Sequence, residues 1–362
     1  MSSSDHKRLV LAGPIEVRKE ILEAQTQWMI GHRGKAFEQL FSSIQNKVKQ
    51  VFRTQNRVYA IATSGTGFWE GASRNAIRDD KKALHFTSGS FSERWAEVSK
   101  ANGKQVDVVA VEWGRAVTPE MVADALKKDT YDAVCVVHNE TSTTVTNPIK
   151  EIAEVVRQYE DTFFLVDTVS GLAGIEFDTD GWGVDIALTS SQKAFALPPG
   201  LAFAAVSDRV LERAKTIPYR GYYFDFLALE QAIVKNSTPS TPPVSTMFAA
   251  DKQLDDILAE GLENRWARHQ QMRDTTHAWA LENGFGLFAE EGYRSPTITA
   301  VDNRERGMDV NAMAAYMSEV GFSMDKGYGK IKGDTFRIGH MGDMSMDFLQ
   351  EVLDGLTAFL KQ

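Results

Sequence analysis

Between about residues 57 and 207, short apolar runs alternate regularly with amphipathic stretches, and this pattern leaves few folds open. Several runs are apolar at every position, as strands buried on both faces of a parallel sheet require. The runs fit strands at 58–62, 83–86, 106–111, 133–137, 163–166, 186–188 and 201–206. The stretches between them fit helices at 67–78, 91–102, 118–128 and 148–159. The alternation predicts an α/β fold with a doubly wound, mostly parallel seven-stranded sheet flanked by helices.

A polar segment rich in proline, at residues 236–243, follows the alternating region and would interrupt any helix. Beyond it, the sequence shows a long helical pattern from 244 to about 283 and further elements of both kinds. We expect these to be strands at 296–301 and 335–339 and helices at 309–320 and from 345 onward. This order is typical of a smaller C-terminal α+β domain.

Charge and cysteine content exclude several classes of protein. The formal net charge is −9 and the acidic residues are spread along the chain, which argues against nucleic acid or an anionic membrane as a partner. The longest uncharged apolar stretch, residues 194–207, is too short to span a bilayer, and residues 9–12 are too few for a secretion signal. We therefore expect a cytoplasmic location. The single cysteine, Cys135, allows neither a disulfide within the chain nor a cysteine metal cluster, and we expect no metal site.

Polar residues follow several of the predicted strands, at the edge where open α/β sheets bind ligands. Ser64-Gly65-Thr66 leads from a strand into a helix and could hold a phosphate on free backbone N–H groups, although a simple capped turn has the same pattern. Asp167 ends another strand, where it could pair with a cationic ligand or cap a turn. Lys193 stands between two apolar segments, and either forms a Schiff base or extends its ammonium to water.

The fourth such segment, residues 138–144, is polar throughout, and by itself it fits a hydrogen-bonded turn. Together, the four segments supply the set that pyridoxal phosphate needs. This cofactor requires a lysine for its aldehyde, an acid that keeps its ring nitrogen protonated, and a helix N-terminus for its phosphate. The sequence therefore predicts a pyridoxal phosphate site.

Nine short segments, in their order along the chain, carry a resemblance to a known family. They are Leu11-Ala-Gly-Pro14, Gly31-His-Arg33, Ser64-Gly-Thr-Gly67, His138-Asn-Glu-Thr-Ser-Thr143, Val166-Asp-Thr-Val-Ser170, Ser191-Gln-Lys193, Pro198-Pro-Gly-Leu201, Arg294-Ser-Pro-Thr297 and Phe336-Arg-Ile-Gly-His-Met-Gly342. In these segments the chain resembles the class V aminotransferases, the alanine–glyoxylate and serine–glyoxylate group of fold-type I pyridoxal phosphate enzymes. The resemblance covers nearly the whole chain. It implies an N-terminal segment near the active site (1–20), a large cofactor-binding domain (21–255) and a small C-terminal domain (256–362).

The resemblance also assigns roles to individual residues. Lys193 matches the Schiff-base lysine, Asp167 the partner of the pyridine nitrogen, and Arg337 the arginine that binds the substrate carboxylate. The remaining matches are cofactor contacts: Val169 and Phe91 on the two faces of the ring, Thr141 near the phenolic oxygen, and Ser64, Gly65, Thr66 and Gln192 at the phosphate. Members of the family are homodimers with shared active sites, and Thr241 matches a phosphate ligand from the partner chain.

The expected activity is transfer of an amino group from alanine or serine to glyoxylate or pyruvate by a ping-pong mechanism. Thr144 and Thr238 depart from the family pattern, which has glycine and often tyrosine at these positions. The His32-Arg33 pair is similar to a segment of phosphoserine aminotransferases, so phosphoserine remains an alternative substrate. A lyase or desulfurase on the same fold and a non-catalytic accessory subunit are further alternatives. The position of Cys135 in a strand disfavours a desulfurase, which needs an exposed cysteine.

Overall fold

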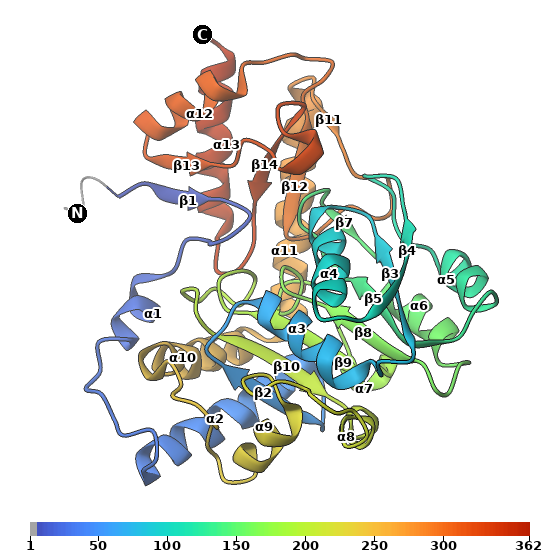
Figure 1. Ribbon diagram of the computed structural model, residues 1–362. Coiled ribbons are helices and arrows are strands. Elements are labelled where there is room, and N and C mark those ends of the chain that lie inside the picture. Colours follow the sequence, from blue (N-terminus) through green and yellow to red (C-terminus); the bar gives the residue numbers. More distant parts are fainter. Residues whose placement is uncertain (1–5) are drawn as a thin grey trace.

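A computed structural model describes residues 6–362, and its centre is a seven-stranded sheet in the order β2-β10-β9-β8-β5-β3-β4 (Figure 1). The strands are β2 (Arg57–Ile61), β3 (Lys82–Thr87), β4 (Gln105–Ala110), β5 (Tyr131–Val137), β8 (Phe163–Asp167), β9 (Ile186–Ser190) and β10 (Ala202–Val206). Strand β10 runs antiparallel to both neighbours, and every other pair is parallel. The predicted mostly parallel sheet and each of its strands are confirmed.

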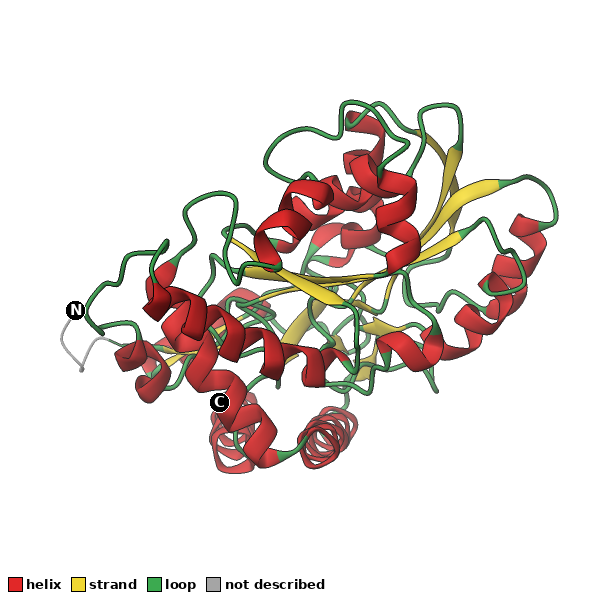
Figure 2. Ribbon diagram, turned by 90° about the horizontal axis from the view of Figure 1, so that it is seen from below, coloured by secondary structure: helices red, strands yellow, loops and turns green. Residues whose placement is uncertain are grey.

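Helices cover both faces of this sheet (Figure 2). Alternate residues of β2 point to opposite faces, so that Val58 and Ala60 join one apolar core and Tyr59 and Ile61 the other. The first core contains residues of α2 (Lys35–Phe52), α5 (Pro119–Leu126), α6 (Ile149–Val156) and α10 (Val244–Glu260). The second contains residues of α3 (Gly65–Ala76), α4 (Ser90–Ala101), α8 (Asp208–Ala214) and α9 (Phe226–Ile233).

The prediction of one long helix at 244–283 is wrong in its continuity. The structure has two helices there, α10 and α11 (Leu262–Glu282). Gly261 separates them with a φ of +81°, a conformation that glycine adopts without steric penalty and that cannot continue a helix. The break turns the chain toward the C-terminal elements, where α11 packs against α13 (Met346–Leu360).

The C-terminal part of the chain has its own small sheet and apolar core. Strands β11 (Gly286–Leu287), β12 (Ile298–Asp302) and β14 (Thr335–Gly339) pair antiparallel, and α12 (Val310–Glu319) and α13 pack beside them (Figure 1). The strands and helices predicted beyond residue 290 are therefore confirmed. The domain boundaries at 20 and 255 stay predictions.

The N-terminal segment links the two parts. Strand β1 (Arg8–Val10) pairs in parallel with β13 (Phe322–Met324), and the chain then continues to α1 (Lys19–Ala24). Residues 1–5 of the expected N-terminal segment lie outside the described residues. The other short elements are β6 (Asn139–Glu140), β7 (Val145–Thr146), α7 (Thr179–Trp182) and a 3₁₀ turn at Gly329–Ile331. In the part of the chain that the structure describes, no helix combines the length and apolarity needed to cross a membrane.

Candidate active site

A cavity of about 590 Å³ opens where β5, β8 and β9 end and α3 and α4 begin. Most of the predicted site residues line it: Ser64, Gly65, Thr66, Phe91, Thr141, Asp167, Val169, Gln192 and Lys193. The side chains of Trp69, Arg94, Val137, Asn139 and Ser190 complete the lining. Thr241 and Arg337 are not among the lining residues. The sheet edge thus gathers side chains from distant parts of the sequence, as ligand sites of α/β sheets do.

Lys193 follows β9 and does not extend to water. The residue is 8% exposed, and its Nζ donates a hydrogen bond to the carbonyl of Ala12 in the N-terminal segment. Gly13 makes this approach possible, because a Cβ at that position would lie 2.5 Å from Cδ of the lysine. Burial and the charge of Arg337 lower the pKa of Lys193 to about 8, which favours the neutral amine that a nucleophile or base needs.

Asp167 ends β8 at the floor of the cavity. Its carboxylate accepts hydrogen bonds from the Trp69 indole N–H at 2.6 Å and from the backbone N–H of Val169 at 2.7 Å. Burial raises the pKa of Asp167 to about 7, against the lowering effect of these two donors. A cationic group bound in the cavity would stabilise the ionised form. The arrangement therefore places a carboxyl group, held by two hydrogen-bond donors, in a site of low polarity.

The first turn of α3 supplies polar groups at the other end of the cavity. Ser64 is the N-cap of α3 in an extended conformation, and its side chain makes no capping hydrogen bond to the helix. Gly65 is required for close packing, since a Cβ there would lie 2.7 Å from Cγ2 of Val169. The hydroxyl of Ser190 is buried beside Gly65, without a hydrogen-bond partner among the described residues. Free donors at a helix N-terminus are what a phosphate group binds.

Phe91 and Thr141 are held together by a buried carboxylate, that of Glu140. Glu140 is fully buried and accepts hydrogen bonds from the backbone N–H groups of Phe91 and Ser92 and from both hydroxyls of Ser92 and Ser142. These bonds join the start of α4 to the loop after β5. Glu140 therefore fixes the positions of the aromatic ring and the threonine relative to each other.

Arg337 belongs to β14, does not line the cavity and is 5% exposed. Its guanidinium donates to the carbonyl of Thr141 at 2.8 Å and to the carboxylate of Asp325 at 2.6 Å. The ring of Tyr328 lies 5.1 Å from the guanidinium carbon and stacks on Phe91 at a centroid distance of 5.5 Å. Tyr328 thus packs both on Arg337 and on Phe91, which lines the cavity.

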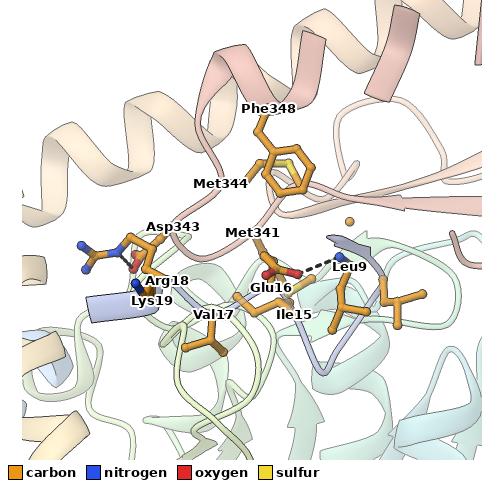
Figure 3. Close-up of a pocket in the computed structure, with 12 residues that line it drawn as sticks. Leu9, Ile15, Glu16, Val17, Arg18, Lys19, Met341, Asp343, Met344 and Phe348 are labelled. Atoms are coloured by element: carbon orange, nitrogen blue, oxygen red, sulfur yellow. Dashed lines mark hydrogen bonds and ion pairs between the residues drawn. The ribbon is translucent and has the colours of Figure 1, made fainter. Parts of the chain in front are cut away.

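A second cavity, of about 570 Å³, lies between the N-terminal segment and the turn before α13 (Figure 3). At its rim, Glu16 accepts a hydrogen bond from the backbone N–H of Leu9 at 2.9 Å, and Arg18 pairs with Asp343 at 2.6 Å. The same Asp343 pairs with buried Arg265, which also donates to the carbonyl of Ala194. These contacts hold the N-terminal segment beside the turn that contains Lys193 and Ala194.

Thr241 is exposed and belongs to the 236–243 segment, which also contacts Arg33. The guanidinium of Arg33 donates to the hydroxyl of Ser237 at 2.8 Å and to the carbonyl of Thr238. Within one chain, neither Arg33 nor Thr241 lines the cavity.

The family model of aminotransferase class-V matches residues 16–328, most of the chain. The chain belongs to the class V aminotransferases. It is 40% identical to an uncharacterized aminotransferase of Methanocaldococcus jannaschii, over 93% of this chain and 88% of that protein. It is 32% identical to the serine–glyoxylate aminotransferase of Arabidopsis thaliana, over 98% of this chain and 90% of that one. The solved alanine–glyoxylate aminotransferase of Nostoc sp. superposes with a TM-score of 0.92 at 27% identity, over 99% and 96% of the two chains.

The predicted family and fold class are therefore confirmed: this class V aminotransferase is a transaminase with the fold-type I architecture. Its cavity also fits the cofactor of that class. A lysine with a lowered pKa, a buried carboxylate and an unpartnered serine hydroxyl next to a helix N-terminus are the groups that an aldehyde, a pyridinium and a phosphate require.

Several residues of the aminotransferase site were not predicted from the sequence. Trp69 lies inside the predicted helix at 67–78, and only the structure shows its contact with Asp167. Gly13 was part of a matched segment, but its packing on Lys193 depends on tertiary structure. Asp325 and Tyr328 lie in a loop whose sequence shows no regular pattern.

Proposed function

We propose that this aminotransferase moves an amino group from a small amino acid, alanine or serine, to glyoxylate or pyruvate, with pyridoxal phosphate as its cofactor and by a ping-pong mechanism. The observation that carries the proposal is that Lys193 and Asp167, with pKa values of about 8 and about 7, line the same cavity. Relatives named serine–glyoxylate and alanine–glyoxylate aminotransferase support the substrate class.

In this proposal Ser64, Gly65, Thr66 and Gln192 would hold the cofactor's phosphate, Asp167 its ring nitrogen, and Val169 and Phe91 its ring. When bound, pyridoxal phosphate supplies an electron-accepting ring that stabilises negative charge at the substrate's α-carbon. Trp69 and the Val169 N–H hold the Asp167 carboxylate in place, and a protonated ring nitrogen beside it would stabilise its ionised form. Thr141 contributes a hydroxyl to the cavity wall.

Lys193 moves the proton. Its amine takes the proton from the α-carbon of the donor as a general base, and a pKa of about 8 leaves a fraction of the amine neutral at physiological pH. Arg337 binds the carboxylate of the donor, for which a buried guanidinium is suited by its fixed fork of N–H groups. The charge of Arg337 also helps to lower the pKa of Lys193.

The substrate class can be tested by comparing kcat/KM for alanine, serine and phosphoserine with glyoxylate as acceptor. We expect alanine or serine to be used at least about tenfold more efficiently than phosphoserine, a gap of ~1.4 kcal/mol in transition-state binding. The reason is charge: a dianionic phosphate needs several cations, and Arg94 is the one arginine that lines the described cavity. A preference for phosphoserine that disappears in Arg33→Ala would establish the alternative substrate instead.

We also propose that two copies of the chain share their active sites, with Thr241 of one chain at the phosphate of the other. Trp28, Tyr219 and Tyr222 are at least 87% exposed, and apolar surface of this kind is typically covered by a subunit contact. Thr241→Ala should weaken binding of pyridoxal phosphate about tenfold, whereas Thr216→Ala, at another exposed threonine, should not change it. A sedimentation experiment that finds a fully active monomer would refute the shared site.

A further inference from the structure

Arg337, which the proposed function assigns to the substrate carboxylate, already forms an ion pair with a carboxylate of the protein. Asp325 Oδ2 accepts a hydrogen bond from Arg337 at 2.6 Å, and the two residues also pair through their backbones, with Arg337 N–H donating to the carbonyl of Asp325 at 3.1 Å. The side chains are 13% and 5% exposed, so the ion pair is shielded from solvent and from salt. A substrate carboxylate would therefore meet a guanidinium whose charge is already neutralised.

The remaining hydrogen-bonding capacity of Arg337 shows where a second anion could bind. Its Nε–H is buried without a partner among the described residues, while one terminal nitrogen donates to the Thr141 carbonyl and the other to Asp325. A bidentate carboxylate needs two adjacent N–H groups of the guanidinium. It would therefore have to share a nitrogen with Asp325 or displace it, and in either case two negative charges would approach each other.

The loop that carries Asp325 is fixed at both ends. The other oxygen of Asp325 accepts the backbone N–H of Gly327 at 2.9 Å, which forms a tight turn before Tyr328. Tyr328 lies over the guanidinium, and its hydroxyl accepts a hydrogen bond from Arg94 at 2.9 Å. Upstream, Asp325 directly follows β13, which pairs with β1, and the continuation of β1 holds Lys193 through the Ala12 carbonyl. The two-stranded sheet of β1 and β13 thus positions Ala12, the partner of Lys193, and Asp325, the partner of Arg337.

We propose that Asp325 is a built-in competitor for the substrate carboxylate and sets the affinity of the site for its substrates. This inference rests on the proposed role of Arg337. Asp325 occupies Arg337 between turnovers and keeps its charge compensated in the buried site. An incoming α-carboxylate then binds by taking over part of this ion pair, and the competition raises the KM for donor and acceptor alike.

The test compares Asp325→Asn with the wild-type holoenzyme, with glycolate as a ligand because it has a carboxylate but no amino or oxo group. Calorimetric titration of Asp325→Asn should show binding of glycolate about tenfold tighter than in the wild type, which corresponds to ~1.4 kcal/mol. The KM values for serine and glyoxylate should fall by a similar factor, while kcat changes less. Asp334→Asn, in the same loop but exposed and without a side-chain hydrogen bond to residues 6–362, should leave both glycolate affinity and KM unchanged.

Two further variants separate the possible failures. Asp325→Ser also removes the charge and should bind glycolate more tightly than the wild type, so a loss of fold in the asparagine variant alone would not decide the result. If Asp325→Asn binds glycolate no more tightly than the wild type, Asp325 serves only to orient Arg337 and the inference fails. If instead Arg337→Gln binds glycolate as well as the wild type does, the carboxylate role of Arg337 in the proposed function fails.

Discussion

Replacing Lys193 with alanine should lower the rate of transamination by at least about a thousandfold. The variant lacks the amine that takes the proton from the α-carbon of the donor, and no other lysine lines the described cavity. The same amine is the proposed attachment point of pyridoxal phosphate, so the visible absorption of the purified protein should change as well. Activity with serine and glyoxylate and the absorption spectrum measure the two effects independently.

The attachment point can be located directly by reduction of the wild-type protein with borohydride, followed by peptide mapping. We expect the cofactor on Lys193, while Lys127→Ala, at an exposed position at the end of α5, should retain full activity and the wild-type spectrum. A label on any other lysine would contradict the assignment of the whole site. The backbone should tolerate the alanine, because among the described residues the Nζ of Lys193 makes a single hydrogen bond, to the carbonyl of Ala12.

The sheet could be predicted because the apolar runs that form its strands can be recognised in the local sequence. Strands β8 and β9 begin with runs of buried apolar residues, and the polar residues that end them mark the edge of the sheet. Asp167 and Lys193 could be placed at one edge for that reason alone. By contrast, α2 was not predicted, although Phe37, Phe41 and Ile44 follow a helical period, because it lies outside the strand and helix alternation that starts at residue 57.

The details of the site depend on contacts between residues far apart in the sequence. The pairing of Asp325 with Arg337 depends on an isolated antiparallel bridge between the residue after β13 and strand β14, which no periodicity in the sequence shows. The sequence predicts Arg337 at the cavity, but it does not show that Tyr328 covers this arginine. Gly261 is one glycine among 27, and its positive φ follows from packing of the two helices that it separates. Tertiary structure decides each of these points.

Asp167→Asn should lower kcat at least about a hundredfold, because asparagine removes the fixed charge next to the proposed ring nitrogen. Asp185→Asn is a matched control at the opposite end of β9. Asp185 is also buried, its pKa is also raised by burial, and it accepts hydrogen bonds from the Phe164 N–H at 3.0 Å and the Ser207 hydroxyl at 2.9 Å. If both variants lost activity to the same extent, Asp167 would act through the fold alone.

The same substitution should change how stability depends on pH, in a direction that the buried environment determines. Burial raises the pKa of Asp167 from 3.8 to about 7, so the folded protein without cofactor binds more protons than the unfolded chain between these values. Stability contributed by this group is present below about pH 4 and is lost as the pH rises toward 7, by roughly 4 kcal/mol at most. Urea unfolding of cofactor-free protein should therefore show wild type losing stability relative to Asp167→Asn from pH 5 to pH 8. A constant difference between the two proteins would show that the carboxylate is ionised throughout, and that its hydrogen bonds to Trp69 and Val169 outweigh its burial.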